Sequence, residues 1–191
     1  MRLLSRVGRA VAPHSRLVTP NGPIAPDFAR PGEAYPLMVT SRTMRFVFID
    51  GIWVGVHTAA APTAEEWQTH CLNIEQVRND TRGVLVYTEG GGPSTGQRKE
   101  MRAALQGLAP PPSAILTDSA LVRGIVTALN WTFGGEKIAA FPPGALPRAL
   151  HYLERNGAAP KHGAITRALG VLANELSIEL PRMGSESPPP A

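Results

Sequence analysis

Hydrophobic and polar positions alternate regularly through the middle of the chain. Residues 46–49 and 52–56 are two short apolar runs rich in β-branched and aromatic side chains. Asp50 and Gly51 lie between them and are a strong signal for a two-residue hairpin, because type I′ turns need positive φ at both central positions. The pattern predicts two strands joined by a tight turn.

Two segments begin with a capping box and continue with apolar residues at helical spacing. Thr63 is followed three residues later by Glu66, and Ser94 is followed in the same way by Gln97. In such a box the two side chains satisfy amide groups that a helix start leaves free. The apolar positions are Trp67, Cys71, Ile74 and Val77 in the first segment, and Met101, Ala104, Leu105 and Leu108 in the second. Both segments are predicted to be helices.

The remaining apolar runs extend this alternation. Strands are predicted at 84–87, 114–117 and 137–141, and each is followed by a helical pattern. The unbroken first run is typical of a central strand that is covered on both faces. A last helix is predicted over 163–177, where it either packs on this domain or docks a partner. The order β-β-α-β-α-β-α-β-α indicates a small α/β domain with one mixed sheet of four to five strands, the later ones parallel.

The composition divides the chain into a domain and two polar ends. Residues 1–43 are rich in proline and polar breaks, which predicts a disordered arm. Met44 is an alternative start that would leave this arm untranslated. The domain is expected at 44–155, a C-terminal helix within 156–180 and a disordered tail at 181–191.

Charge and cysteine content narrow the function classes. The formal net charge of the 191 residues is +4, and the excess of arginine lies in the N-terminal segment. No basic patch with interleaved aromatic residues appears, so nucleic acid is not an expected partner. The single cysteine, Cys71, forms no intramolecular disulfide, which fits a cytoplasmic protein. No apolar run approaches the length of about 18 residues that a membrane span needs.

The segment VLVYTEGGGPSTGQRKEM, which starts at Val84, places a glycine-rich loop between a predicted strand and a predicted helix. Gly91 and Gly96 have the spacing of a phosphate-binding P-loop. Gln97 and Arg98, however, stand where that motif needs lysine and a hydroxyl residue, so nucleotide hydrolysis is not expected. Weak anion binding remains an expectation, because free amides and the helix dipole point to this helix start.

The same loop also matches the G-x-S-x-G pattern of a serine hydrolase at residues 92–96. Asp118 and His151 follow Ser94 in the chain order of a catalytic triad. A nucleophile elbow, however, puts its serine directly at the strand end, whereas residues 89–93 separate Ser94 from the strand. A hydrolase that uses Ser94 therefore stays an alternative, and no catalytic residue is assigned.

The remaining candidate residues are scattered. The five histidines show no paired ligand spacing, so no metal site is expected, and no motif indicates a cofactor. Trp131 and Phe133 stand beside Gly134 and Gly135 at a predicted helix end. They either close the core or line a pocket near the edge of the sheet.

The strand order and the loop resemble the STAS domain, the fold of bacterial anti-sigma factor antagonists, and more narrowly the uncharacterised bacterial proteins described as STAS/SEC14-like. The resemblance covers residues 45–154 and centres on Ser94 and Thr95, which precede a glycine. In that family a serine at this step is phosphorylated by a partner kinase, which is itself the anti-sigma factor. The resemblance therefore implies phosphorylation of Ser94, with Thr95 as its neighbour. The sequence departs from the family at Pro93, where Asp is usual, and at Gln97, where Leu is usual.

The sequence favours a non-enzymatic regulatory or protein-interaction module that uses the glycine-rich loop and the following helix start for recognition. A protein partner is expected, of the kinase or anti-sigma type that the resemblance implies. Phosphorylation of Ser94 or Thr95 would add about two negative charges at a helix start beside basic residues. The residues of this partner-binding or anion loop are Gly91, Gly92, Gly96, Gln97, Arg98 and Lys99. The alternatives are the hydrolase and a carrier of a lipid or another small ligand, which the link to SEC14-like domains implies.

Overall fold

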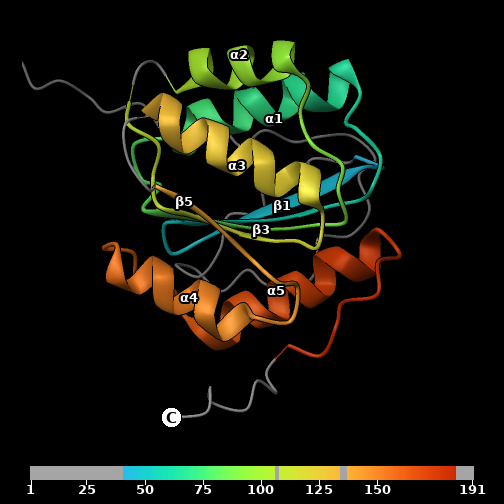
Figure 1. The fold of residues 1–191 in the computed structure, drawn as a ribbon, viewed down its shortest axis with the longest axis vertical. Coiled ribbons are helices and arrows are strands. Elements are labelled where there is room, and N and C mark those ends of the chain that lie inside the picture. Colours follow the sequence, from blue (N-terminus) through green and yellow to red (C-terminus); the bar gives the residue numbers. More distant parts are fainter. Residues whose placement is uncertain (1–40, 106–107, 134–136, 184–191) are drawn as a thin grey trace, which may run out of the picture.

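A computed structural model describes residues 41–105, 108–133 and 137–183. The expected arm up to residue 40 and the expected tail from residue 184 lie outside the described residues. Within the described part, one sheet lies between two layers of helices (Figure 1).

The sheet has five strands in the sequential order β1-β2-β3-β4-β5. They are β1 (Met44–Ile49), β2 (Ile52–His57), β3 (Gly83–Thr88), β4 (Ser113–Leu116) and β5 (Ile138–Phe141). β1 runs antiparallel to β2, and all later neighbours are parallel. Asp50 and Gly51, with φ of 49° and 84°, form the predicted turn between β1 and β2. The mixed sheet and the order of the elements confirm the predicted fold class.

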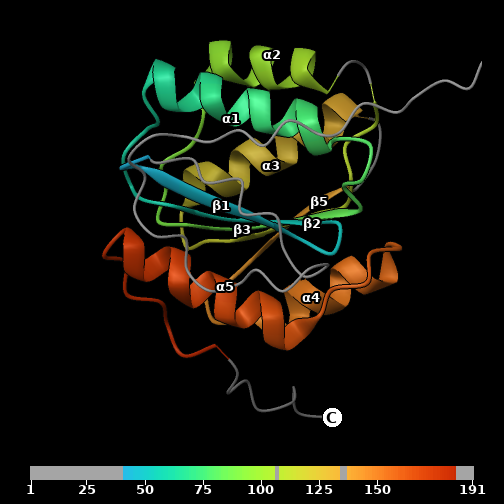
Figure 2. The same cartoon turned by 180° about the vertical axis from the view of Figure 1, so that it is seen from behind.

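Five helices of the described residues cover the two faces of this sheet. They are α1 (Ala64–Val77), α2 (Thr95–Ala104), α3 (Ala120–Phe133), α4 (Leu146–Arg155) and α5 (His162–Glu175). The α1–α3 layer lies on one face and the α4–α5 layer on the other, as Figures 1 and 2 show. The sequential strand order explains why α1, α2 and α3 share a face. Each of them connects a strand to the next parallel strand in the same direction across the sheet, and right-handed connections then place all three helices on the same face. α5 packs against β1 and β2, so the last predicted helix packs in cis.

Both predicted capping boxes are present. The hydroxyl of Thr63 accepts from the amide of Glu66, whose carboxylate accepts from the amide of Thr63. Ser94 and Gln97 make the same pair of bonds at the start of α2. α2 ends before Leu108, which was expected to continue its apolar face. A glycine and a run of prolines follow this helix, and neither residue type favours a helix interior.

The face of the sheet that meets α4 and α5 is closely packed. Alternate strand residues point toward these helices, among them Val54 and Leu85, which are fully buried. Leu153 of α4 and Ile165 of α5 are buried to the same degree. This face holds the larger of the two hydrophobic clusters, so it supplies much of the hydrophobic stabilisation of the domain.

The opposite face is packed by an aromatic cluster at the β1 and β2 edge. Phe46 stacks on the ring of His70 in α1, with centroids 4.3 Å apart, and its centroid lies 5.4 Å from that of Trp53. Gly55 makes room for Phe46, because a Cβ at position 55 would lie 2.2 Å from the Phe46 ring. Trp67 of α1 is almost fully buried in the same cluster. Packing on this face is therefore concentrated at one edge of the sheet.

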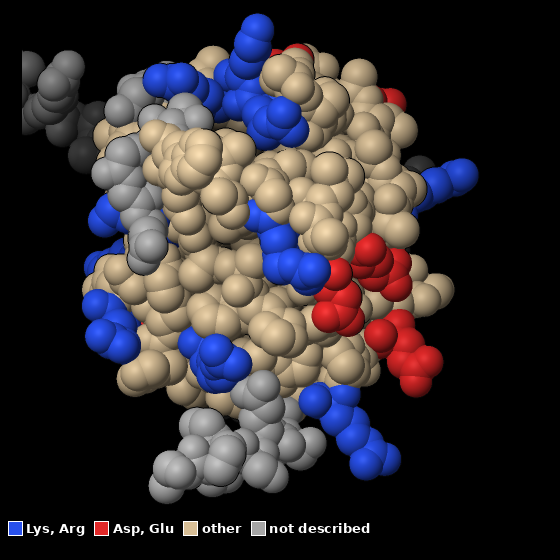
Figure 3. Space-filling model, in the orientation of Figure 1, with Lys and Arg blue, Asp and Glu red and all other residues tan. Residues whose placement is uncertain are grey.

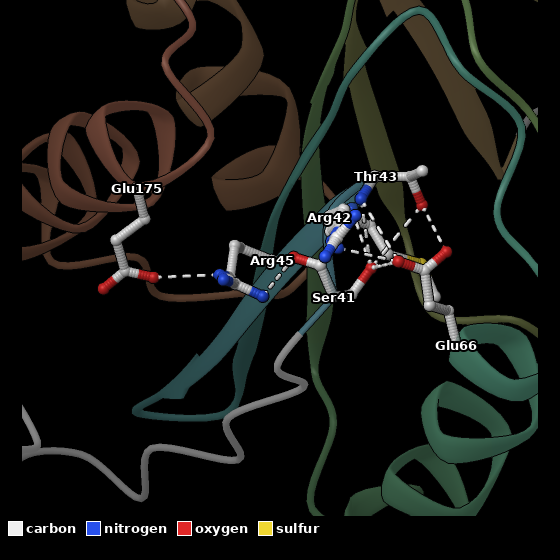
Figure 4. Close-up of polar contacts among 7 residues, drawn as sticks. Ser41, Arg42, Thr43, Arg45, Glu66 and Glu175 are labelled. Carbon is white, nitrogen blue, oxygen red and sulfur yellow. Dashed lines mark hydrogen bonds and ion pairs between the residues drawn. The ribbon is translucent and has the colours of Figure 1, made fainter. Parts of the chain in front are cut away.

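The chain before β1 is tied to α1 through Glu66 (Figure 4). The Glu66 carboxylate accepts hydrogen bonds from the hydroxyls of Ser41 and Thr43 and from three backbone amides. Burial tends to raise its pKa, but the hydrogen bonds from Ser41, the backbone and Thr43 lower the Glu66 pKa to about 2. Figure 4 also shows Arg45 of β1, whose Nε donates to the Glu175 carboxylate of α5 at 3.1 Å. The residues just ahead of β1 are therefore joined to α1, and the start of β1 is joined to α5.

Candidate functional site

A cavity of about 370 Å³ lies between the sheet and the α1–α3 layer. Its floor includes Val84 and Val86 of β3 and Ile115 of β4, which point to this face. Its roof includes Met101 of α2 and Ile125 of α3. All five side chains are only partly buried, although they lie between the two layers. The open space of the cavity accounts for this exposure.

The cavity exists because the α1–α3 layer stands off from the central strands. α4 and α5 approach the strands closely, whereas α2 packs mainly on α1 and α3 packs mainly on β5. The sequence of α2, TGQRKEMRAA, offers few apolar side chains to fill the space below it. α2 is held at its start instead. There Trp67 Nε1 donates to the Gln97 carbonyl oxygen at 2.9 Å, and Gln97 Nε2 donates to the Pro62 carbonyl oxygen at 3.0 Å.

Three buried polar side chains from the aromatic cluster, His57, His70 and Trp53, line the cavity. The Nδ1 atoms of both histidines and the Nε1 atom of Trp53 have no hydrogen-bond partner within the described part of the chain. Burial lowers the pKa of His57 to about 4, and burial together with the nearby His57 lowers the pKa of His70 to about 3. Both imidazoles are therefore neutral at pH 7, with one donor and one acceptor each. Because buried polar groups in proteins are nearly always bonded, these three call for an explanation.

The glycine-rich loop borders the cavity at the carboxyl ends of the parallel strands. Gly91, Gly92 and Pro93 belong to its lining. The Gly91 amide donates to the Thr58 carbonyl oxygen at 3.1 Å, and a Cβ on Gly91 would lie 2.4 Å from that oxygen. The Thr88 hydroxyl at the end of β3 donates to the Gly91 carbonyl oxygen at 3.0 Å. Glycine is thus required here by the close approach of the loops that follow β2 and β3.

Arg98 supplies a positive charge at this end of the cavity. Its guanidinium donates to the Pro93 carbonyl oxygen at 2.7 Å and to the Thr95 hydroxyl at 2.8 Å, which fixes its position. Among the described residues, no carboxylate lies within ion-pair distance of Arg98. A guanidinium has five N–H donors, so Arg98 keeps hydrogen-bonding capacity and an unbalanced charge at the cavity wall.

The structure divides the predicted loop residues between the cavity and the outer surface. Gly91, Gly92 and Arg98 line the cavity, and Gln97 ties α2 to α1. Ser94 is the N-cap of α2, its hydroxyl accepting from the Gln97 amide at 3.2 Å. The exposed members are Ser94, Thr95, Gly96 and Lys99. They lie in a region where Lys and Arg side chains gather over α2 (Figure 3). Phosphorylation of Ser94 or Thr95 stays a prediction.

The hydrolase alternative requires Ser94, Asp118 and His151 to meet. Ser94 starts α2 and His151 lies on α4, and these helices are on opposite faces of the sheet (Figure 1). His151 is exposed, and its Nδ1 atom lies 3.6 Å from the Glu154 carboxylate. The sheet separates the serine from the histidine, so these residues do not form a triad.

The sequence patterns did not point to His57 and His70 as site residues. A signal was nevertheless present, because Trp53 and His57 fall on the same face of β2 by strand alternation. His70 follows Trp67 by three positions, which places both on the buried face of α1. Trp131, a candidate for a pocket, is 84% exposed on α3 and does not line the cavity.

No family model, no curated protein and no solved structure matches this chain. Across the described ranges, no helix is long and apolar enough to cross a membrane. The same residues contain no group of three or more His, Cys, Asp or Glu side chains placed to hold a metal ion. The arguments for function therefore come from the cavity and from the loop that borders it.

Proposed function

We propose that this chain is a non-enzymatic binding protein that takes up a small, mostly apolar molecule in the cavity below α2 and α3. The cavity itself carries the proposal. Its volume of about 370 Å³ falls within the range of about 300–1,000 Å³ that is usual for small-molecule sites. Its walls are aliphatic and aromatic with a few polar groups, which is the usual composition of such sites. The carrier, an alternative from the sequence, is thereby the function that the geometry supports best.

An empty apolar space of this size would be costly. Cavities left by truncated core side chains cost about 24 cal/mol per Å³. A fully enclosed void of 370 Å³ would therefore cost about 9 kcal/mol, which is the upper limit for this partly open cavity. Small domains are stable by only about 5–15 kcal/mol in total. Water would gain little in most of the cavity, because aliphatic walls offer it no hydrogen bonds. A bound apolar molecule would remove most of this cost.

A regulatory role, with a protein partner, is compatible with the same site. The loop that lines the cavity on its inner side presents Ser94 and Thr95 on its outer side. A partner that contacts this loop would therefore contact a segment whose inner side touches the ligand. The resemblance to the STAS domain favours a partner of the kinase or anti-sigma type. The lack of a basic patch with interleaved aromatic residues in the sequence argues against a nucleic acid. The single cysteine, which can form no intramolecular disulfide, favours a cytoplasmic location.

The first test is to look for a bound molecule and for an empty site. The full chain is purified under native conditions, extracted with organic solvent, and the extract is analysed by mass spectrometry. Protein refolded free of ligand is then titrated with N-phenyl-1-naphthylamine, a neutral apolar dye that fluoresces when it leaves water. We expect one extractable molecule per chain, or saturable uptake of one dye molecule by the refolded protein.

Two tryptophan substitutions separate cavity binding from surface adsorption. Val86→Trp places a large ring in the cavity, and Leu121→Trp places the same ring on the exposed side of α3. Val86→Trp should lose dye binding while Leu121→Trp keeps it, with both variants folded by circular dichroism. If the parent protein carries no molecule and takes up no dye, the cavity is not a binding site.

A further inference from the structure

The two ends of the cavity differ in unused hydrogen-bonding capacity. At the end next to the last turn of α1, Thr81 and Ser113 each donate to a backbone carbonyl oxygen, at 2.8 and 2.9 Å. Arg78 donates to another carbonyl oxygen at 3.0 Å. The Arg82 side chain is exposed and lies against Gly51 at the hairpin turn. The two hydroxyl groups at this end have therefore already used their single donors on the protein.

The end formed by the glycine-rich loop is different. Arg98 is half-buried, is fixed by two hydrogen bonds and has no acidic partner in the described ranges. His57, the last residue of β2, is 93% buried, because only 7% of its surface is exposed, and it points to the cavity face of the sheet. The buried Nδ1 atom of His57 has no hydrogen-bond partner among the described residues. A positive charge and a neutral donor are thus both unused at one end of an apolar space.

The cavity extends along the length of β3. Val84, Val86 and Thr88 all line it. These alternate positions span about 13 Å at the usual rise of about 3.3 Å per residue. The volume of about 370 Å³ is near the lower limit of small-molecule sites, so it accommodates a single-chain molecule better than a larger two-chain one.

We propose that the ligand is a single-chain amphiphile with an anionic acid group, bound with that group at Arg98 and His57 and with its apolar chain along β3. The inference rests on the binding function proposed above and adds the class of the ligand and its direction. A carboxylate is the head group that the site favours, because the planar fork of Arg98 matches two carboxylate oxygens. His57 can donate a further hydrogen bond without carrying a charge.

The test compares ligands that differ only in the head group. Dodecanoate, dodecanol and dodecyl phosphate are used to displace N-phenyl-1-naphthylamine from the ligand-free full chain at one pH and salt concentration. We expect dodecanoate to bind about 10- to 100-fold more tightly than dodecanol, the range for a hydrogen bond to a charged group. If dodecyl phosphate displaces the dye more strongly than dodecanoate does, the site for an anionic head group is supported, but the preferred head group is a phosphate and not a carboxylate. Equal displacement by dodecanoate and dodecanol would overturn the proposal.

Substitutions then assign the head-group preference to Arg98. Arg98→Met keeps the aliphatic stem and removes the charge, and Arg102→Met removes a charge from the exposed surface of the same helix. Arg98→Met should bind dodecanoate and dodecanol with similar affinity. Arg102→Met should keep the preference. Arg98→Lys retains the charge and should retain part of the preference. The circular dichroism spectrum of Arg98→Met should equal that of the parent, so that its loss of preference is not a folding defect.

The outcomes distinguish this inference from the proposed function. If the neutral dye does not bind at all, the proposed function fails and the inference fails with it. If the dye and dodecanol bind but Arg98→Met leaves the preference for dodecanoate unchanged, only the inference is wrong. The acid group would then lie at another part of the cavity.

Discussion

Placing phenylalanine on the two faces of the sheet tests whether the space over β3 is open. Val86 points to the cavity and is partly buried, whereas Val54 on the neighbouring strand points to the α4–α5 layer and is fully buried. The two strands are paired in the sheet, and Val and Phe have similar preferences for strands. Val86→Phe and Val54→Phe therefore differ mainly in the space that receives the added ring.

The expected magnitudes follow from this difference in packing. Adding carbon atoms to a packed core costs about 1–3 kcal/mol or more, which is the expectation for Val54→Phe. The four added carbon atoms of Val86→Phe enter open space, and burial contributes at most about 0.8 kcal/mol for each. Because the cavity is only partly enclosed, we expect a change between zero and about 2 kcal/mol of added stability. The two variants should thus differ by at least about 1 kcal/mol.

Urea unfolding of ligand-free protein, followed by far-UV circular dichroism, measures both free energies. The denaturant slopes of the two variants should equal that of the parent, since the surface exposed on unfolding hardly changes. If Val86→Phe destabilises the protein as much as Val54→Phe does, the side chains around Val86 leave no open space for the added ring. The cavity would then be absent in solution, and the argument for a ligand would lose its basis.

Three further predictions concern residues around the site. At pH values above 4.5, Glu66→Gln should lower the free energy of unfolding by about 1–2 kcal/mol, which is the value from proton linkage reduced for solvent screening. The loss should become smaller as the pH falls toward the Glu66 pKa of about 2. Glu65→Gln, at an exposed position, should lose less stability, and chemical denaturation at several pH values measures both variants. Below pH 6.5, His70 takes up a proton in the unfolded chain but not in the folded protein, where its pKa is about 3. The free energy of unfolding therefore decreases as the pH is lowered. His70→Phe should reduce the slope of the free energy of unfolding against pH by up to about 1.4 kcal/mol per pH unit. Gly91→Ala should lower the melting temperature measured in thermal melts, because its Cβ would lie 2.4 Å from two carbonyl oxygens. Gly92→Ala has open space for its Cβ and should leave the melting temperature unchanged.

Local signals were sufficient for most of the fold. Asp50 and Gly51 identified the hairpin, and the residue pairs that begin with Thr63 and Ser94 identified the starts of α1 and α2. Each of these features depends on residues within four positions of one another. The end of α2 was placed too late, because Leu108 matches the helical period although the sequence around it favours a turn.

The cavity was not predictable in the same way, since it depends on the distance between two layers. The apolar run of β3 correctly indicated a central strand, and complete cover on both faces was expected. Val84 and Val86 are nevertheless only partly buried, because α2 carries few apolar residues and is held by its start. No pattern within β3 reveals how closely α2 approaches it. A count of apolar residues in each covering helix would have been the useful signal.

Arg98 joins the two functional hypotheses for this chain. One side of its guanidinium holds Pro93 and Thr95 in the exposed loop, and the residue also lines the cavity. An acid group of a ligand and a phosphate on Thr95 would be two anions that compete for the same guanidinium. Binding of Arg98 to one anion would therefore weaken its interaction with the other. Coupling between two sites is reciprocal in free energy. A ligand that engages Arg98 would therefore change what a partner meets at the loop, and a modified loop would change the affinity for the ligand, with no need for a large movement of the domain.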